Sequence, residues 1–406
     1  MATPVVNTQL DTLNAHVNDI KTLLSAKNAL DAERNTSLAI LAGNGAGLDV
    51  DIDVIVSLVR QGKLRDLMDY GDQLVIPWTR SGTSYDAPFN FCHLENCELV
   101  DGETVPVADF EWDYTTIDGI VYDEPEAIYA SSSNLAAGTY HFTVANDSWG
   151  GNNGKVIQFT LPQALTAGQQ IRKSVAYNAL ITSGTLGVYA DGASRTPLYT
   201  MTPTEGSSGT DLGTTDGSGD LNHWHRVALG YNRWSQSAAR QYLNSTAAAG
   251  SWWTQQNKWD VAPAIATALD GFLHGYDADI ISHFLPTKIQ TACNTVTDSG
   301  VTDTTYDRVF LASLQQINIT PQVADVEGEA WNYYKRLLGS GTTLATGTYP
   351  KLIKYALNAK TSAQYRWLRS ANRGNAYYVW FVYSSGTVNY HGANNGHRLC
   401  PACRIG

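Results

Sequence analysis

Apolar residues near the amino terminus recur at alternating spacings of three and four, which is typical of the seam of a coiled coil. The seam positions are Leu10, Leu13, Val17, Ile20 and Leu24. Lys27 occupies the next one and weakens the seam there. The spacing predicts a coiled-coil stalk over 1–35 that makes the chain a homo-oligomer, with a trimer as the working hypothesis. One amphipathic helix packed on its own domain would show the same spacing.

The pattern changes twice after the stalk. The run Asn44-Gly45-Ala46-Gly47 interrupts any regular structure, and 51–68 has the apolar spacing of a second, shorter helix. We therefore expect 36–68 to be a linker followed by a short helix.

From Tyr70 onward, short apolar runs are separated by Gly, Asp, Asn and Ser, which predicts strands and turns. The alternating segments 138–144, 155–161 and 186–190, followed by a Gly/Ser/Thr-rich stretch, predict a small β-rich domain inserted at 130–219. The larger domain would then comprise 69–129 and 220–406. Within it, 237–243 and 327–338 are predicted to be helical. The expected fold class is α+β.

Composition favours a folded recognition protein. Only 16% of the 406 residues are charged, 35 are Gly and 22 are Tyr. Tyrosine supplies contact area at low entropic cost. The formal net charge is −11, from 27 basic and 38 acidic residues.

The distribution of charge and apolar residues excludes some classes of partner. The last acidic residue is Glu329, and the basic residues after it are scattered rather than clustered, so we expect no nucleic-acid partner. No apolar run of about 18 residues occurs, and the first residues lack the basic and apolar regions of a signal peptide. We expect neither membrane insertion nor a signal peptide. Five Cys residues do not make a disulfide framework, which favours synthesis in a reducing cytoplasm.

Two loops resemble ligand motifs but lack required residues. Asp49-x-Asp51-x-Asp53 begins like a calcium loop, yet Val54 and Arg60 stand where Gly and Glu are needed. The run 150–155 lacks the first Gly and the final Ser or Thr of a phosphate loop. We interpret the first as a solvated helix start and the second as a turn.

Two further pairs have the spacing of metal or redox sites. Cys400 and Cys403 form a CxxC motif, but no helix follows it and no second pair is nearby in sequence. His223 and His225 share one strand face without a third clustered ligand. We expect buried structural thiols and hydrogen-bonded core histidines, with no metal, no cofactor and no catalytic residues.

The strongest signal lies near the carboxyl end. The motifs are WLRS at 367–370 and RLCPACR at 398–404, with supporting segments at 222–227, 232–244 and 309–313. This set resembles phage and prophage proteins of the C-type-lectin fold, in the branch related to formylglycine-generating enzymes. The resemblance covers about 67–129 and 220–406, and it implies that Trp367, Leu368, Pro401 and Arg404 are scaffold residues. In that family the closing motif is RPA-x-R, whereas here two residues separate Arg398 from Pro401.

The segment between the two motifs is rich in Asn, Tyr, His and Gly. It resembles the variable region of a diversity-generating retroelement target, in which adenines of a template repeat are rewritten. From Ala371 to His397 only Trp380 falls outside the residue types that such rewriting of Asn codons reaches. An aromatic row along 376–383 is expected to be exposed, because aromatic residues lie on both faces of that strand. The resemblance makes 367–406 the ligand-binding segment, with contacts from Arg373, Asn375, Tyr377, Tyr378, Phe381, Tyr383, Thr387, Asn389, Tyr390, His391, Asn394, Asn395 and His397.

The resemblance implies a phage or prophage adhesin. Its expected partners are a bacterial cell-surface protein or glycan and other virion proteins, and its expected location is the tail or capsid surface of the virion. Three alternatives stay open: a purely structural virion protein, an ordinary fold-closing hairpin without a ligand, and an oxidase of the formylglycine-generating type.

Overall fold

The computed structural model describes residues 16–22, 52–132, 134–144, 154–175, 177–214, 229–339 and 342–406. It shows a mixed α+β chain with many short strands and few, short helices. Of the predicted stalk, only 16–22 is described. This segment is helical, and its seam residues Val17 and Ile20 are 40% and 63% exposed. The rest of the stalk lies outside the described residues.

A five-stranded sheet forms the centre of the larger domain. Its order is β1-β2-β3-β22-β15, with bounds β1 Gln73–Arg80, β2 Thr83–Glu98, β3 Thr104–Trp112, β22 Pro401–Ile405 and β15 Val309–Leu311. Ser81 and Gly82 join β1 to β2 with φ values of 50° and 77°. Positive φ at both turn residues matches the twist of a tight hairpin. The last strand thus lies inside the sheet, between β3 and β15.

Two short helices pack on this sheet where one was predicted. They are α2 (Ile52–Arg60) and α3 (Leu64–Leu67), separated by Gly62 at φ 66°. The buried face of α2 carries Ile52, Ile55, Val56 and Val59, which belong to the main core. The helix predicted over 51–68 is therefore present as two shorter helices, and burial of its apolar face makes them part of the larger domain.

The remaining helices are short. α5 (Ala238–Leu243) follows the prediction, and the Ser237 hydroxyl accepts a hydrogen bond from the Arg240 amide at its start. α7 (Asn332–Leu338) begins later than the predicted 327, because Glu327 is buried and its carboxylate binds other strands. The others are α4 (Tyr177–Leu180), α6 (Ala278–His283) and the 3-10 turns Trp234–Gln236, Ala264–Thr267, Phe272–Gly275 and Pro350–Leu352. In the described ranges, no helix has the length and apolar character needed to cross a membrane.

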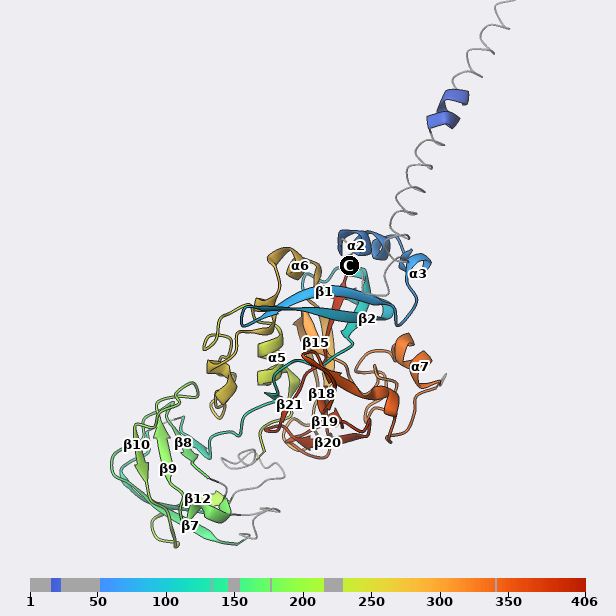
Figure 1. The fold of residues 1–406 in the computed structure, drawn as a ribbon. Helices are drawn as coiled ribbons and strands as arrows, with labels where there is room; N and C mark the ends of the chain where they lie inside the picture. Colours follow the sequence, from blue (N-terminus) through green and yellow to red (C-terminus); the bar gives the residue numbers. More distant parts are fainter. Residues whose placement is uncertain are drawn as a thin grey trace, which may run out of the picture.

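Smaller strand groups complete the larger domain. The three-stranded sheet β18-β19-β20 consists of Arg366–Ala371, Tyr378–Val382 and Val388–Gly392. The paired strands are β13 (Thr287–Ala292) with β14 (Thr302–Asp307), β16 (Lys354–Ala356) with β17 (Ala359–Gln364), and β4 (Ile120–Val121) with β21 (Gly396–His397). Figure 1 shows α2 and α3 at one end of this domain and β20 at the other.

Buried tryptophans fill the core between these groups. Trp78, Trp112, Trp234 and Trp367 are almost completely buried. Each indole N–H has a partner; for example, Trp367 donates to the Ile120 carbonyl at 3.1 Å. Satisfied indoles combine a large buried area with no unpaired donor. Trp367, Leu368, Pro401 and Arg404 are all buried, which confirms the prediction that they are scaffold residues.

The inserted segment has a core of its own. Two four-stranded sheets enclose a separate apolar cluster that includes Phe142, Phe159 and Leu186. The side chain of Gln170 joins this body to the larger one by donating to the carbonyls of Lys258 and Asp260 at 2.8 and 2.9 Å. It is the green body in Figure 1. Its strands are β5 Tyr129–Ala130, β6 Gly138–Thr143, β7 Val156–Leu161, β8 Gln170–Lys173, β9 Leu186–Tyr189, β10 Tyr199–Met201, β11 Thr204–Glu205 and β12 Thr210–Thr214.

Candidate ligand-binding surface

The predicted contact residues lie on the small sheet β18-β19-β20 and on the loops that flank it. Trp380 of β19 is paired with Tyr390 of β20, and Phe381 is paired with Asn389. A tight turn joins the two strands, and the Tyr383 amide donates to the Thr387 carbonyl at 2.8 Å across it. Gly386 is required in this turn, because its φ is 83° and a Cβ would lie 2.2 Å from the Tyr349 carbonyl oxygen.

One face of this sheet carries an aromatic group that we call the outer tyrosine cluster: Tyr377, Tyr378, Trp380 and Tyr390. The ring centroids of Tyr378 and Tyr390 are 5.0 Å apart, and those of Trp380 and Tyr390 are 5.4 Å apart at 86°. Tyr390 is 42% exposed, Tyr377 and Tyr378 are half-buried, and Trp380 is 7% exposed. The buried ring of Trp380 thus packs edge-on against the exposed ring of Tyr390.

The opposite face is packed into the domain. Phe381 is fully buried, and its ring stacks on His397 with centroids 4.9 Å apart. His397 itself is 8% exposed. The expectation that Phe381 contacts a ligand is therefore wrong. His397 offers little exposed surface to a ligand. Neither row of 376–383 is exposed along its length, because β19 is the middle strand of the sheet and is covered on both faces.

His391 and His397 form a hydrogen-bonded pair on this inner face. His391 Nδ1 and His397 Nε2 are 2.9 Å apart, and the two rings stack at 5.1 Å. Burial lowers the pKa of both imidazoles, and the neighbouring His391 helps to lower that of His397 to about 3. Both rings are thus neutral at pH 7, with one nitrogen donating to the other.

A hollow adjoins this histidine pair. Its volume is about 360 Å³, and it is lined by Gly119, Ala363, Gln364, Tyr365, Gly396, His397 and Arg398. Tyr365 is 39% exposed and packs edge-on against Tyr383 at 5.0 Å. Tyr365 was missed by the sequence analysis, although it stands directly before the WLRS motif.

The loop before β19 is held by a buried asparagine through main-chain atoms. Asn232 is fully buried, and its side-chain amide donates to the carbonyl oxygens of Asn372, Asn375 and Tyr378 at 3.2, 2.6 and 2.9 Å. Its backbone N–H donates to the Ala376 carbonyl at 3.0 Å. None of these bonds depends on the identity of a loop side chain. These bonds position the loop backbone whichever side chains the loop displays, and the side chains of Asn372 and Arg373 add further contacts.

The loop after β20 is held in a similar way. The Ala393 amide donates to the Tyr377 carbonyl at 2.9 Å, and the Asn394 amide donates to the Leu229 carbonyl at 2.9 Å. Gly230 allows this close approach, because a Cβ there would lie 2.6 Å from the Asp123 carbonyl oxygen. Both loops thus present side chains from a backbone fixed by distant parts of the chain.

The other predicted contact residues divide into two groups. Arg373 is an anchor, because its guanidinium donates to the carbonyls of Cys293 and Gly300 at 2.8 and 3.1 Å. The second group has half-buried side chains that form hydrogen bonds, with Thr348 in the case of Thr387 and with residues at most three positions away in the other cases. These residues are Asn375, Thr387, Asn389, Asn394 and Asn395. Tyr383 is also half-buried and packs on Phe381 with centroids 4.4 Å apart.

A loop outside the carboxyl segment borders this surface. The Thr295 amide donates to the Arg373 carbonyl at 2.8 Å, and the nearby Val296 and Val301 are 37% and 46% exposed. No local pattern in the sequence indicates this contact, because it joins positions far apart in the chain.

The CxxC thiols lie in the core rather than at this surface. Both are free and fully buried, and Cys400 Sγ donates to the Trp112 carbonyl at 3.0 Å. Burial raises the pKa of the Cys400 thiol to about 12 and raises that of Cys403 as well. A raised thiol pKa disfavours the nucleophilic thiolate. Among the residues that the structure describes, no three His, Cys, Asp or Glu side chains gather as a metal site would require. The pair His223 and His225 and the loop 150–155 fall on or reach into the ranges that are not described.

Comparison with known families covers the carboxyl half of the chain. Residues 209–406 match the model of a family described as Domain of unknown function (DUF6273). No curated protein and no solved structure matches the chain. The matched range contains β18, β19, β20 and β22 together with all the predicted contact residues.

Proposed function

We propose that this chain is a phage or prophage receptor-binding protein that presents the outer tyrosine cluster and its flanking loops to a bacterial cell-surface protein or glycan. The proposal includes a C-type-lectin-like fold for the larger domain and diversification of the carboxyl segment by a retroelement. Its location would be the tail or capsid surface of the virion.

One observation carries this proposal. The loop at 372–378 is held by Asn232 through carbonyl oxygens alone, so its side chains can change without loss of those bonds. A binding surface that varies in sequence needs a backbone that does not depend on the varied residues. The main-chain bonds of Ala393 and Asn394 meet the same need on the other side of the sheet.

The chemistry of the surface also supports recognition. Tyr390 is a rigid side chain with an exposed ring. The rings of Tyr378 and Trp380 pack against it with centroids 5.0 and 5.4 Å away. Asn389 precedes it in β20, and Asn394 and Asn395 stand in the loop that follows that strand. Aromatic anchors with adaptable amides around them are typical of binding surfaces that accept varied ligands.

The position of the last strand supports the lectin-like fold. β22 lies between β3 and β15 in the same sheet as β1, so the beginning and the end of the larger domain meet there. The end of the RLCPACR motif supplies this closure, because Pro401–Ile405 forms β22 and is buried.

A cell-binding assay tests the proposal. The full chain, labelled and purified, would be incubated with intact cells from a panel of bacteria. Tyr390→Ala should weaken binding to a positive strain by about tenfold, the loss expected for a central aromatic contact. Tyr355→Ala is the matched control, because Tyr355 is 38% exposed on β16, outside the proposed surface. Absence of binding to every strain, together with stable incorporation into virions, would favour a structural virion protein instead.

The DNA that flanks the gene tests the retroelement. A near-copy of the codons for 367–406, differing at adenines and lying beside a reverse transcriptase gene, would support diversification and identify the variable positions. Absence of such a copy would contradict diversification while leaving the cell-binding test intact.

A further inference from the structure

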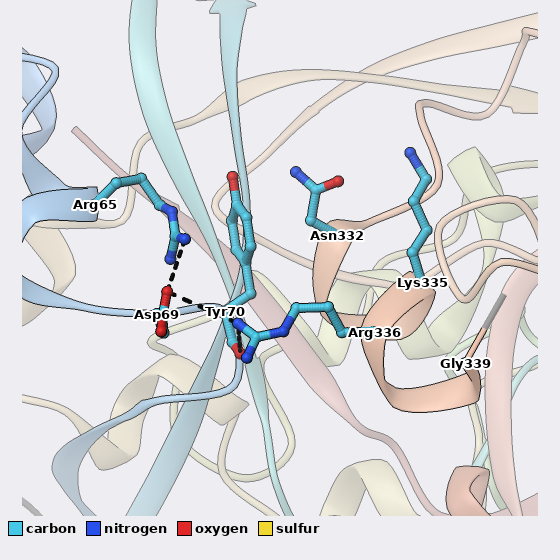
Figure 2. Close-up of a pocket in the computed structure, with 7 residues that line it drawn as sticks. All are labelled: Arg65, Asp69, Tyr70, Asn332, Lys335, Arg336 and Gly339. Atoms are coloured by element: carbon cyan, nitrogen blue, oxygen red, sulfur yellow. Dashed lines mark hydrogen bonds and ion pairs between the residues drawn. The ribbon is translucent and has the colours of Figure 1, made fainter. Parts of the chain in front are cut away.

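A second hollow lies between the segment after α3 and helix α7. Its volume is about 730 Å³, within the usual range of small-molecule sites. Figure 2 shows the side chains that line it; the charged and polar ones are Arg65, Asp69, Tyr70, Asn332, Lys335 and Arg336. None of these residues belongs to the surface described above.

The hollow carries an excess of positive charge. Three of its side chains are cations and one is a carboxylate, so the local formal charge is positive in a chain whose formal net charge is −11. Asp69 Oδ1 lies 2.7 Å from Arg65 Nη2 and 3.8 Å from Arg336 Nη1. One carboxylate is thus shared by two guanidinium groups, and both retain further N–H donors.

The two arginines are held in place before any ligand binds. The guanidinium of Arg65 lies over the ring of Tyr70 at 4.2 Å and donates to the Met68 carbonyl at 2.8 Å. Arg336 Nη1 donates to the Tyr70 carbonyl at 3.1 Å. A preorganised guanidinium loses little side-chain entropy when an anion binds.

Helix α7 adds a donor pair from the other side. Asn332 and Lys335 are three positions apart and therefore share a helix face. In Figure 2 both side chains lie to the right of the Tyr70 ring, and Arg65 lies to its left. In the described part of the chain, neither side chain has a hydrogen-bond or ion-pair partner. Favourable interaction with the helix dipole explains basic residues in the last turns of α3 and α7, but not the convergence of Arg65 and Arg336 on one carboxylate, that of Asp69.

We propose that this hollow binds a small ligand with two or more oxyanion groups, either phosphates or carboxylates. The fixed guanidinium groups of Arg65 from α3 and Arg336 from α7, together with the ammonium of Lys335 and the amide of Asn332, supply donors for separate oxyanions. The overall negative charge of the chain repels anions at long range, so binding would depend on this local set. The proposal does not depend on the cell-binding function.

Calorimetric titration of the full chain tests this inference. Pyrophosphate is the phosphate probe and citrate is the carboxylate probe, both at low ionic strength. We expect saturable binding of at least one probe with a Kd between about 10 μM and 1 mM. The probe that binds more tightly identifies the class of oxyanion. Absence of saturation by either probe at about 10 mM would overturn the proposal.

Three variants locate the binding. The double variant Lys335→Gln with Arg336→Gln should weaken binding by about tenfold or more, because charge-assisted hydrogen bonds are lost. Lys360→Gln is the control; it removes a cation that lies over the ring of Tyr114, outside the hollow. Asp69→Asn gives the opposite readout, since it removes a repelling carboxylate and should tighten binding. Equal affinities for the wild type, the double variant and Asp69→Asn would contradict the proposal, as would a loss as large in Lys360→Gln.

Discussion

The side-chain amide of Asn294 donates a hydrogen bond of 3.0 Å to Oδ1 of Asn232, and both side chains are fully buried. This bond fixes the orientation of the Asn232 side chain, because it occupies Oδ1. The Nδ2 group of Asn232 therefore points to the loop carbonyls at 372–378 and donates to them. Asn294 is fixed in turn, because its Oδ1 accepts from the amides of Val296 and Thr297. The two asparagines connect a loop near residue 295 to the proposed binding surface.

Replacing Asn232 should loosen the loop and destabilise the domain. Asn232→Ala removes the side-chain donor to three loop carbonyls and the acceptor of the buried Asn294 amide, and we expect a loss of about 1–3 kcal/mol in the free energy of unfolding. Asn389→Ala is the matched control, because its side chain binds only the adjacent Tyr390 amide, and it should change stability by less than about 0.5 kcal/mol. Urea unfolding monitored by tryptophan fluorescence measures both. Equal stability of the two variants would show that Asn232 does not hold the loop.

Two aromatic residues of the same hairpin should respond in opposite ways. Tyr390→Ala should leave the melting temperature near that of the wild type, because the ring is 42% exposed. Phe381→Ala should cost about 3–5 kcal/mol, because the ring is fully buried and a cavity is left. Differential scanning calorimetry separates the two. A large loss in Tyr390→Ala would place that ring in the core and remove it from the binding surface.

The histidine pair predicts a loss of stability in acid. The folded protein keeps His397 neutral until the pH falls to about 3, whereas an unfolded histidine takes up a proton near pH 6.5. The unfolded state therefore binds more protons in this window, and stability falls as the pH drops from about 6.5 towards 3.

The variant His397→Phe isolates this contribution, because other buried groups also titrate. We expect the wild type to lose about 1–2 kcal/mol more than His397→Phe between pH 7.5 and pH 5. Urea unfolding at the two pH values gives the difference. The same pH dependence in both proteins would show that the His397 pKa is not lowered.

A buried charge group beneath the small sheet should be sensitive to loss of its carboxylate. Glu111 is fully buried, with Arg366 Nη1 at 3.6 Å and Lys354 Nζ at 3.8 Å. Glu111→Gln leaves these buried cations with less compensation and should cost about 3–5 kcal/mol. Glu98→Gln breaks the exposed pair with Lys288 and should remain close to the wild type. Chemical denaturation compares them, and equal stability would contradict a structural role for Glu111.

Local features of the fold could be predicted from the sequence alone. Alternating residues predicted the strands β6, β7 and β9 of the insert, and Ser237 stands at the start of α5 as its cap. Trp367 and Leu368 of the WLRS motif were correctly assigned to the scaffold, since both are buried. These features depend on neighbours within a few positions, and the physical chemistry of strands and caps acts at that range.

The exposure of the candidate surface was decided by tertiary packing. Aromatic residues lie on both faces of 376–383, and only the packing of β19 against the domain separates buried Phe381 from the half-buried tyrosines. The clamp by Asn232 joins residues up to 146 positions apart, and the cationic hollow unites α3 with α7. By itself, the sequence determined the short-range elements, the insert and the scaffold motifs. Only the tertiary structure decided which side chains reach solvent and which distant polar groups meet. The free energy of these contacts comes from packing between residues far apart in the chain, and no local pattern encodes that packing.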